Sequence, residues 1–255
     1  MFIDYCISKY KMRIKGVIHI GAHYGEEHNV YKINNINNLV YFELLNDNFK
    51  VLETRIGKEA ILYKLALGSE EKEIEMFVES ANNGQSSSIL EPDIHLIQYP
   101  SIVFDKKEVV MMKRLDDVID NSTSDYNLIN IDVQGYELEV FRGSIKTLGN
   151  IDYIIAEINR DEVYKNCAKI HELESFLRDF DFQLVEENWI GKTWGDGLFI
   201  KNSILNDLTF LRQSAGENDI PTEDQISDIK NLSIEKQALL FMQEKYSRKN
   251  PPKVN

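Results

Sequence analysis

Val17-Ile18-His19-Ile20-Gly21-Ala22-His23-Tyr24-Gly25, followed after a polar segment by Leu39-Val40-Tyr41-Phe42-Glu43, is the stretch that decides the fold. The first apolar run predicts a buried strand, and Gly21 and Gly25 follow it where the chain must turn tightly. The second apolar run ends in the carboxylate of Glu43. An acid about 20 residues after a glycine turn is typical of nucleotide-binding crossovers, where it accepts hydrogen bonds from ribose hydroxyls. The stretch therefore predicts a ligand that carries a ribose.

The composition indicates a globular protein that needs no disulfides. The chain has 255 residues, of which 43% are hydrophobic, and this is enough for a large domain with its own core. Its net charge of −13 argues against nonspecific binding to nucleic acid or anionic membranes, because both require a basic surface. Cys6 and Cys167 lack the spacing of metal ligands, and no stretch is long and apolar enough to span a bilayer. We therefore expect a cytoplasmic protein.

Apolar runs rich in Val, Ile, Tyr and Phe alternate with helical segments between residues 17 and 200. This alternation predicts an α/β fold with a mostly parallel sheet and helices on both faces. Residues 68–72 predict the turn of a hairpin-like insertion, and the polar residues 81–88 predict a solvated loop. The predicted strands are Val17–Ile20, Val40–Glu43, Ile61–Leu67, Ile74–Val78, Val109–Lys113, Leu128–Val133, Tyr153–Ile158, Gln183–Glu187 and Leu198–Ile200. The predicted helices are Glu26–Ile33, Asp47–Arg55, Leu115–Ile119, Glu137–Leu148 and Ile170–Phe180.

The composition of the chain changes near residue 202. We predict a main domain over residues 1–202 and a helical appendage with a disordered tail over residues 203–255. Thr222-x-x-Gln225 resembles a capping box at the start of a helix in this appendage. The appendage could pack against the main domain or join two copies of the chain in a homodimer.

Two further carboxylates end apolar runs that should be central strands. Asp132 lies at the end of residues 128–133, and Glu157 lies near the end of residues 153–158. The carboxyl ends of central parallel strands form the ligand-binding edge of an open sheet, so both acids should face one cleft. There they could act as a general base or bind a divalent metal ion. A helix cap at Asp132 and a buried ion pair at Glu157 are the structural alternatives.

Two histidines distinguish this chain from dinucleotide-binding proteins and zinc proteases. His23 occupies the position of the second glycine in Gly-x-Gly-x-x-Gly, where its side chain would crowd a pyrophosphate. A nicotinamide-dependent enzyme is therefore disfavoured, and His23 becomes a candidate for a role in the ligand-facing turn. His19 and His23 are on a strand and its turn, without the helix and glutamate of a zinc-protease motif.

The order of several short motifs resembles the FkbM family of S-adenosylmethionine-dependent methyltransferases from about Gly16 to Ile200. The most specific motif is Asp132-Val133-Gln134-Gly135-Tyr136-Glu137. The resemblance implies a class I methyltransferase fold, which is a Rossmann-like sheet of mostly parallel strands with one antiparallel strand near the edge. The other motifs are Val17–Gly25, Tyr41-Phe42-Glu43, Leu65-Ala66-Leu67-Gly68, Asn82-Asn83-Gly84 with Ser86-Ser87-Ser88, Arg114-Leu115-Asp116-Asp117, Phe141-Arg142-Gly143 and Glu157.

The resemblance also implies roles for individual residues. The glycine turn would approach the methionine part of S-adenosylmethionine, and Glu43 would hold the ribose hydroxyls. Asp132 and Glu157 would lie on the cleft floor near the reacting methyl group. The chain departs from the family where a first-strand acid is replaced by His19 and a proline by Leu44. The predicted cofactor-binding residues are His19, Gly21, Ala22, Gly25, Glu43, Ala66, Ser88 and Asp132.

The reaction implied by the resemblance is methyl transfer from a sulfonium to a hydroxyl, most often one of a sugar or glycan. Asp132 is the predicted base, with Glu157 and His23 as the other candidates, and a divalent metal ion held by Asp132 and Glu157 remains open. The partner is thus a small-molecule or glycan acceptor. Two alternatives remain: a non-catalytic module that binds an adenosine cofactor, and a methyltransferase for a small molecule that is not a sugar.

Overall fold

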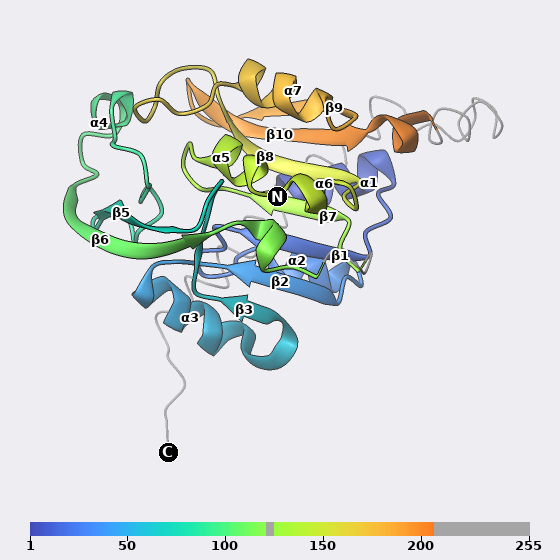
Figure 1. The fold of residues 1–255 in the computed structure, drawn as a ribbon, viewed down its shortest axis with the longest axis horizontal. Coiled ribbons are helices and arrows are strands. Elements are labelled where there is room, and N and C mark those ends of the chain that lie inside the picture. The colour runs from blue at the N-terminus through green and yellow to red at the C-terminus, as the bar shows by residue number, and fades with distance from the viewer. Residues whose placement is uncertain (121–124, 207–255) are drawn as a thin grey trace. The chain divides into compact units, whose positions relative to one another are not determined.

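Seven strands form the main sheet of the computed structural model, in the order β3-β2-β1-β7-β8-β10-β9 (Figure 1). β1 pairs in parallel with β2 on one side and with β7 on the other, and β10 is antiparallel to both β8 and β9. The predicted mostly parallel sheet with one antiparallel strand near its edge is therefore confirmed. The strands are β1 (Gly16–Ile20), β2 (Asn38–Phe42), β3 (Ile61–Tyr63), β7 (Leu128–Ile131), β8 (Tyr153–Asn159), β9 (Phe182–Trp189) and β10 (Trp194–Lys201).

The structure describes residues 1–120 and 125–206, so the expected appendage lies almost wholly outside the described residues. Residues 14–206 belong to one compact unit. Residues 1–13 belong to a second unit, and they contain helix α1 (Phe2–Tyr10), which the sequence did not predict. In the described part of the chain, no helix has the length and apolar character needed to cross a membrane. The division between residues 1–202 and 203–255 stays a prediction.

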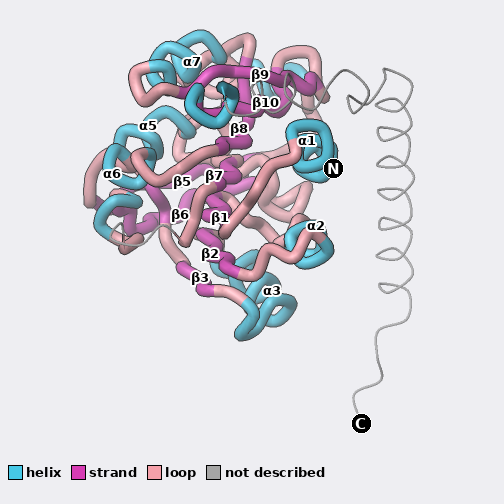
Figure 2. The backbone as a smooth tube through the Cα atoms, turned by 90° about the vertical axis from the view of Figure 1, so that its right-hand side faces the viewer, coloured by secondary structure: helices cyan, strands magenta, loops and turns pink. Residues whose placement is uncertain are grey.

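Helices cover both faces of the main sheet, as predicted. Figure 2 shows α5 (Glu137–Arg142) and α6 (Ile145–Leu148) on one side of the strands and α2 (His28–Ile33) on the other. Every residue of β1 and β8 is buried as a result, which explains why their sequences are almost continuously apolar. The remaining helices are α3 (Asn46–Ile56), α4 (Ile94–Gln98), α7 (Ile170–Arg178) and the 3-10 turns η1 (Gly57–Glu59) and η2 (Leu115–Asp117).

A second, three-stranded sheet corrects the prediction of a hairpin. The predicted strand over residues 61–67 divides in two, because β3 joins the main sheet and β4 (Ala66–Leu67) joins the second sheet. In the second sheet β6 (Phe104–Lys113) lies between β4 and β5 (Lys72–Glu79). Residues 68–72 therefore connect two strands that both pair with β6 instead of with each other.

The helix predicted over residues 137–148 is also divided, and a neighbouring motif supplies the reason. The carboxylate of Asp116 accepts hydrogen bonds from the backbone N–H groups of Lys146 and Thr147, both at 2.9 Å. A carboxylate at this position satisfies N–H groups that have no partner inside the helix and offsets the helix dipole. Asp116 thus starts α6 separately after α5 has ended at Arg142, and the motif that contains Asp116 has a structural role.

Gly21 follows β1 where the strand order reverses, which is where an open parallel sheet forms its ligand crevice. The N–H of Gly21 donates to Phe42 O at 2.9 Å, which ties the turn to the end of β2. The φ angle of Gly21 is 77°, and an added Cβ would lie 1.8 Å from Asp132 O. Only glycine therefore allows the ends of β1 and β7 to approach this closely.

Replacing Gly21 with alanine should lower the free energy of unfolding by roughly 2–4 kcal/mol, because the new methyl group overlaps a backbone oxygen. Urea denaturation followed by circular dichroism measures this loss. The matched control is Gly57→Ala, since Gly57 also has a positive φ of 58° but an added Cβ would have no heavy atom within 4 Å. Equal losses in the two variants would show that backbone conformation alone, and not the close approach to Asp132, restricts Gly21.

Candidate functional site

A cavity of about 500 Å³ lies at the carboxyl ends of the central strands, and its volume is typical of small-molecule sites. Residues from β1, β4, β5, β7, β8 and β10 contribute to its lining, together with Glu43 directly after β2 and the loop over residues 82–89. The sheet therefore brings together residues that are more than 100 positions apart in the sequence. The predicted site residues that line the cavity are His19, Gly21, Ala22, His23, Glu43, Ala66, Ser88, Asp132 and Glu157.

Gly25 is the predicted cofactor-binding residue that does not line the cavity. Its φ is 70°, and an added Cβ would lie 2.8 Å from side-chain carbons of both Leu52 and Ile56 in α3. The structure thus places Gly25 where the turn packs against a helix. The sequence pattern could not separate these roles, because packing and cofactor approach both favour glycine.

The strand register explains why two carboxylates meet on the cavity floor. His19 of β1 lies abreast of Asn130 of β7, which lies abreast of Ile155 of β8, and all three line the cavity. Side chains on one face of a strand recur every second residue. Asp132 and Glu157, each two positions further along, therefore come next on the same face.

Glu43, directly after β2, is held by two backbone N–H groups. Its Oε2 accepts from the N–H of His23 and its Oε1 from the N–H of Leu45, both at 2.8 Å. Burial raises the pKa of Glu43 to about 7, even though the two N–H groups favour the charged carboxylate. Each oxygen keeps further acceptor capacity, so the carboxylate can also receive a pair of hydroxyl groups.

His23 is held with both ring nitrogens engaged. Its Nδ1 lies 2.8 Å from Glu26 Oε1, and its Nε2 lies 3.0 Å from the backbone oxygen of Asn83. Burial alone would lower the pKa of His23, but the hydrogen bond and negative charge of Glu26 outweigh burial, so the pKa is raised. Two acceptors around the ring favour the doubly protonated form. This geometry leaves no free nitrogen to take a proton from a substrate.

His19 is a buried residue of the cavity lining. Burial lowers the pKa of His19 to about 4. Its Nδ1 can therefore accept a hydrogen bond from the Tyr31 hydroxyl at 3.2 Å, while Asn130 donates to the same hydroxyl at 2.8 Å. His19 thus belongs to a hydrogen-bonded chain that runs from β1 through α2 to β7.

Glu27 is a cavity residue that sequence reasoning missed. Its Oε2 lies 3.9 Å from His19 Nε2. Burial and the nearby charge of Glu26 raise the pKa of Glu27 to about 7. The residue before α2 therefore brings a carboxylate beside His19. His19 stands at the position where the family that the sequence resembles has an acid in its first strand. The sequence did not single out Glu27, because acids are common at the start of a helix, where they interact favourably with the helix dipole.

Gln134 is a second missed residue, and it joins the two predicted floor carboxylates. Its Nε2 lies 2.7 Å from both Asp132 Oδ1 and Glu157 Oε2. Burial and the charges of Asp132 and Glu137 raise the pKa of Glu157 well above its ordinary value. Gln134 is in the left-handed backbone region with a φ of 55°, an uncommon conformation for a residue that is not glycine.

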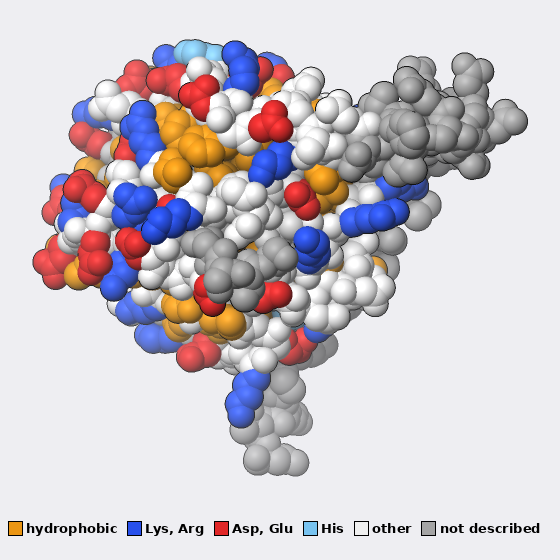
Figure 3. All heavy atoms as spheres, turned by 45° about the vertical axis from the view of Figure 1, so that its right-hand side comes forward, with side chains coloured by type: hydrophobic (Ala, Val, Ile, Leu, Met, Phe, Trp, Pro, Cys, Tyr) orange, Lys and Arg blue, Asp and Glu red, His pale blue; other side chains and the backbone are white. Residues whose placement is uncertain are grey.

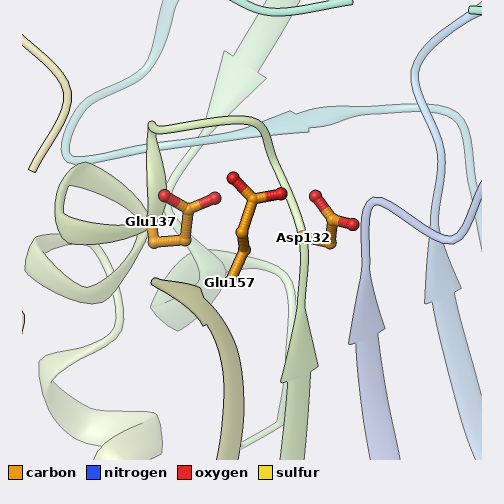
Figure 4. A group of neighbouring side chains, drawn as sticks. All are labelled: Asp132, Glu137 and Glu157. Atoms are coloured by element: carbon orange, nitrogen blue, oxygen red, sulfur yellow. The ribbon is translucent and has the colours of Figure 1, made fainter. Parts of the chain in front are cut away.

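Glu137 brings a third carboxylate to this group (Figure 4). Its Oε1 accepts from the N–H groups of Val133 at 3.0 Å and Gly135 at 3.1 Å. One oxygen from each of Asp132, Glu137 and Glu157 lies within 4.8 Å of the others. Burial raises the pKa of Glu137 to about 7. The sequence placed Glu137 in the most specific motif, but it did not indicate that the side chain turns back toward β8.

The cavity is acidic along much of its lining. Among the described residues that line it, there are six carboxylates and no Lys or Arg. By contrast, acidic and basic side chains are interspersed on the surface face shown in Figure 3. The local charge favours a cationic or uncharged ligand over one that carries phosphate. The six carboxylates belong to Glu26, Glu27, Glu43, Asp132, Glu157 and Asp196.

The loop over residues 81–88 is not the solvated connection predicted from its composition. Six of its residues line the cavity, and Ser87 and Ser88 are buried. The Ser88 hydroxyl donates to Gln134 O at 2.7 Å and accepts from the N–H of Leu90 at 3.0 Å. Ser88 therefore joins this loop to the turn that carries Gln134.

Aromatic side chains form another part of the cavity lining, and the sequence did not indicate that they meet there. The Trp194 Nε1–H donates to the Tyr99 hydroxyl at 2.7 Å, and both side chains line the cavity with His95. Trp194 is the first residue of β10, and Tyr99 follows α4. Their contact depends on two elements that are 95 residues apart in the sequence.

Comparison with known proteins matches residues 19–184 to the family model described as "Methyltransferase FkbM domain". A curated relative is the 2-O-methyltransferase NoeI of Sinorhizobium fredii, which is 32% identical over 97 residues. These residues are 38% of this chain and 40% of NoeI, so the match spans less than half of that protein.

Solved structures show more distant similarity. The magnesium protoporphyrin IX methyltransferase ChlM of Synechocystis, with bound S-adenosylmethionine, has a TM-score of 0.40 and 8% identity, with 72% of this chain and 69% of ChlM covered. The putative tRNA (m1A22) methyltransferase Sp1610 of Streptococcus pneumoniae, in complex with S-adenosylmethionine, has a TM-score of 0.41 and 12% identity. The match covers 88% of this chain and 86% of Sp1610. The strand order, rather than these resemblances, identifies the fold.

The raised pKa of Glu43 predicts a pH-dependent stability. Between its ordinary value of 4.5 and about 7, folded Glu43 keeps a proton that the unfolded chain has released. The folded state then binds more protons, so Glu43 makes the free energy of unfolding fall as pH rises through this window, by at most about 1.4 kcal/mol per pH unit. Urea denaturation should show that wild type loses stability relative to Glu43→Gln between these pH values.

The comparison with Glu43→Gln isolates this one group, since the lowered pKa of His19 acts with the opposite sign. The amide of Glu43→Gln can change the free energy of unfolding by a constant amount. Such a constant does not affect the test, because the prediction concerns only how the stability difference changes with pH. Glu53→Gln, which removes an exposed carboxylate of α3, controls for the loss of one negative charge. A stability difference between wild type and Glu43→Gln that stays constant across the window would contradict the prediction.

Proposed function

The chain belongs to the FkbM methyltransferase domain family, and from this premise we propose that it transfers a methyl group from S-adenosylmethionine to a hydroxyl of a sugar or glycan. The family match covers residues 19–184, which is more than half of the chain. The observation that carries the proposal is the cavity at the carboxyl ends of the strands, with carboxylates but no Lys or Arg among its described lining residues. Such a lining suits a cationic cofactor and an uncharged acceptor.

The cofactor follows from the charge of the site. S-adenosylmethionine carries a sulfonium and an ammonium group, and both are attracted by carboxylates. We assign Glu43, directly after β2 in the cavity lining, to accept hydrogen bonds from the two ribose hydroxyls, as acids do in other open parallel sheets. Glu27 lies beside His19, and we assign it to receive the ammonium group, which the family's first-strand acid would otherwise hold. A dinucleotide is disfavoured, since its pyrophosphate would meet the same carboxylates.

The chemistry asks little of the protein beyond alignment and a base. The methyl group is already activated in the sulfonium, so the site mainly positions the acceptor oxygen and excludes water. A base that takes the hydroxyl proton contributes typically about 10²–10⁴-fold. We assign this role to Asp132, which is exposed and lines the cavity, whereas Glu157 is buried and its pKa is raised well above its ordinary value by burial and by the neighbouring carboxylates. We do not assign this role to His23, because both of its ring nitrogens are engaged with Glu26 and Asn83.

Two observations support a sugar hydroxyl as the acceptor. The relative NoeI is named a 2-O-methyltransferase, which supports transfer to oxygen. The cavity combines carboxylates, which accept hydrogen bonds from hydroxyl groups, with the aromatic side chains of Trp194 and Tyr99, and aromatic rings can pack against the C–H face of a sugar. An acceptor that carries phosphate would again be repelled by the lining.

Titration calorimetry tests the cofactor. S-adenosylmethionine and its demethylated product should bind, whereas NAD should not. Glu43→Gln should weaken S-adenosylmethionine binding by about 1–3 kcal/mol, the scale of a hydrogen bond to a charged group. Glu53→Gln, on the exposed side of α3, is the matched control and should bind as wild type does. Absence of binding by S-adenosylmethionine to the wild-type chain would refute the proposed function.

Asp132→Asn tests the base and separates an enzyme from a non-catalytic binding module. The variant should still bind S-adenosylmethionine but should lose most methyl transfer to a panel of oligosaccharides, measured as a mass gain of one methyl group. Asp105→Asn, an exposed change on β6, should keep wild-type turnover. Unchanged turnover in Asp132→Asn would remove Asp132 as the base, and methylation of non-sugar hydroxyls alone would redirect the acceptor assignment.

A further inference from the structure

We propose that Asp132, Glu137 and Glu157 form a binding site for one hard divalent cation, Mg²⁺, Mn²⁺ or Ca²⁺, at the floor of the cavity (Figure 4). The three carboxylates come from three different positions in the fold. Asp132 directly follows β7, Glu137 begins α5, and Glu157 lies in β8. The site is therefore assembled by the sheet and by the turn between β7 and α5.

The spacing of the oxygen atoms fits a cation placed among them. One oxygen of each carboxylate lies within 4.8 Å of the others. Oxygen ligands bind Mg²⁺ at about 2.0–2.1 Å and Ca²⁺ at about 2.3–2.6 Å, so two ligands on opposite sides of either ion are about 4–5 Å apart. A donor set made only of oxygen atoms is typical of sites for these hard cations, whereas imidazole and thiolate ligands are typical of zinc and copper sites.

The second observation is the unpaired oxygen of Glu137. The residue is 0% exposed, and its Oε1 is already bound to the N–H groups of Val133 and Gly135. Its Oε2 is buried and has no hydrogen-bond partner among the described residues. Figure 4 shows the Glu137 carboxylate turned toward Glu157. A buried polar atom without a partner is costly, and a cation between these carboxylates supplies the missing partner.

The surroundings of Gln134 point in the same direction. The Tyr164 hydroxyl has one hydrogen to donate, but two acceptor oxygens lie 2.8 Å from the hydroxyl oxygen. These acceptors are Ser86 O and Gln134 Oε1. A 180° rotation of the Gln134 amide gives Tyr164 a donor and turns Oε1 toward Asp132 and Glu157. Without a cation, Gln134 Nε2 faces the two carboxylates. With a cation, the rotated amide offers a fourth oxygen ligand.

The site is accessible and can take part in the reaction. Asp132 and Glu157 line the cavity, which gives a cation a route from solvent. A bound cation would hold the acceptor hydroxyl and lower its pKa, and this role rests on the proposed function. Binding of the cation itself does not rest on the proposed function. Asp132 has two oxygens, so it can bind the cation with one and accept a proton with the other.

Cation binding to the full chain tests the site in the absence of S-adenosylmethionine. The protein is treated with a chelator and then titrated with MgCl₂, MnCl₂ and CaCl₂ by calorimetry, with Mn²⁺ also followed by electron paramagnetic resonance. We expect one saturable site and a higher melting temperature with the cation, because the ion binds only the folded chain. Absence of saturable binding by all three cations at millimolar concentration would overturn the proposal, whatever the result with S-adenosylmethionine.

Variants then locate the site. Glu137→Gln should lower the affinity for the cation by roughly 10–100-fold, because even residues that only support metal ligands change metal affinity on this scale. Its amide keeps an oxygen for the N–H groups of Val133 and Gly135, so the fold should persist. Glu139→Gln, two residues further along α5 and hydrogen-bonded to Ser69, is the matched control and should bind as wild type does. Glu157→Gln is the second test, should Glu137→Gln not fold. If Glu137→Gln and Glu157→Gln fold and bind the cation as tightly as wild type does, the assignment of the site to these carboxylates is overturned.

Discussion

The site depends on the close approach of β1 and β7 at their carboxyl ends. There the N–H of Asp132 donates to Ile20 O at 3.0 Å, and Gly21 leaves the space that any side chain would fill. The same turn is held to the end of β2 through Phe42 O, so three strand ends share one small region of backbone. The cavity, the position of Glu43 and the meeting of the floor carboxylates all follow from this contact.

The second constraint is electrostatic. Buried carboxylates such as Glu43, Glu137 and Glu157 lie in or beside one cavity, and burial makes their charged forms costly unless donors or cations are near. The backbone offsets part of this cost, since N–H groups bind Glu43 and Glu137. Burial still raises the pKa values of both groups to about 7, so each holds a proton up to a higher pH than an exposed carboxyl group does. A cationic ligand favours the charged carboxylates, so the acidity of the cavity and the charge of the proposed cofactor are complementary.

The fold could be predicted well from the sequence because the central strands are buried on both faces. Continuous apolar runs such as residues 17–20 and 153–158 leave few other structures open, and the alternation with helices predicts parallel pairing. Prediction was weaker where local and tertiary preferences differ. The strand predicted over residues 61–67 divided because its two halves joined different sheets, and the helix predicted over residues 137–148 divided because Asp116, distant in sequence, capped a new start.

The sequence by itself determined the order of the elements, the glycine turn and the carboxylates that end the strands, because these depend on local periodicity and on single residue types. It also carried the motifs that identify the family. Only the tertiary structure decided which side chains share the cavity: it placed Glu27 beside His19, Gln134 between Asp132 and Glu157, and Gly25 against α3. The physical reason is that such contacts depend on strand register and on loop paths. Both are set by packing between distant segments, on which the local pattern of residues carries no information.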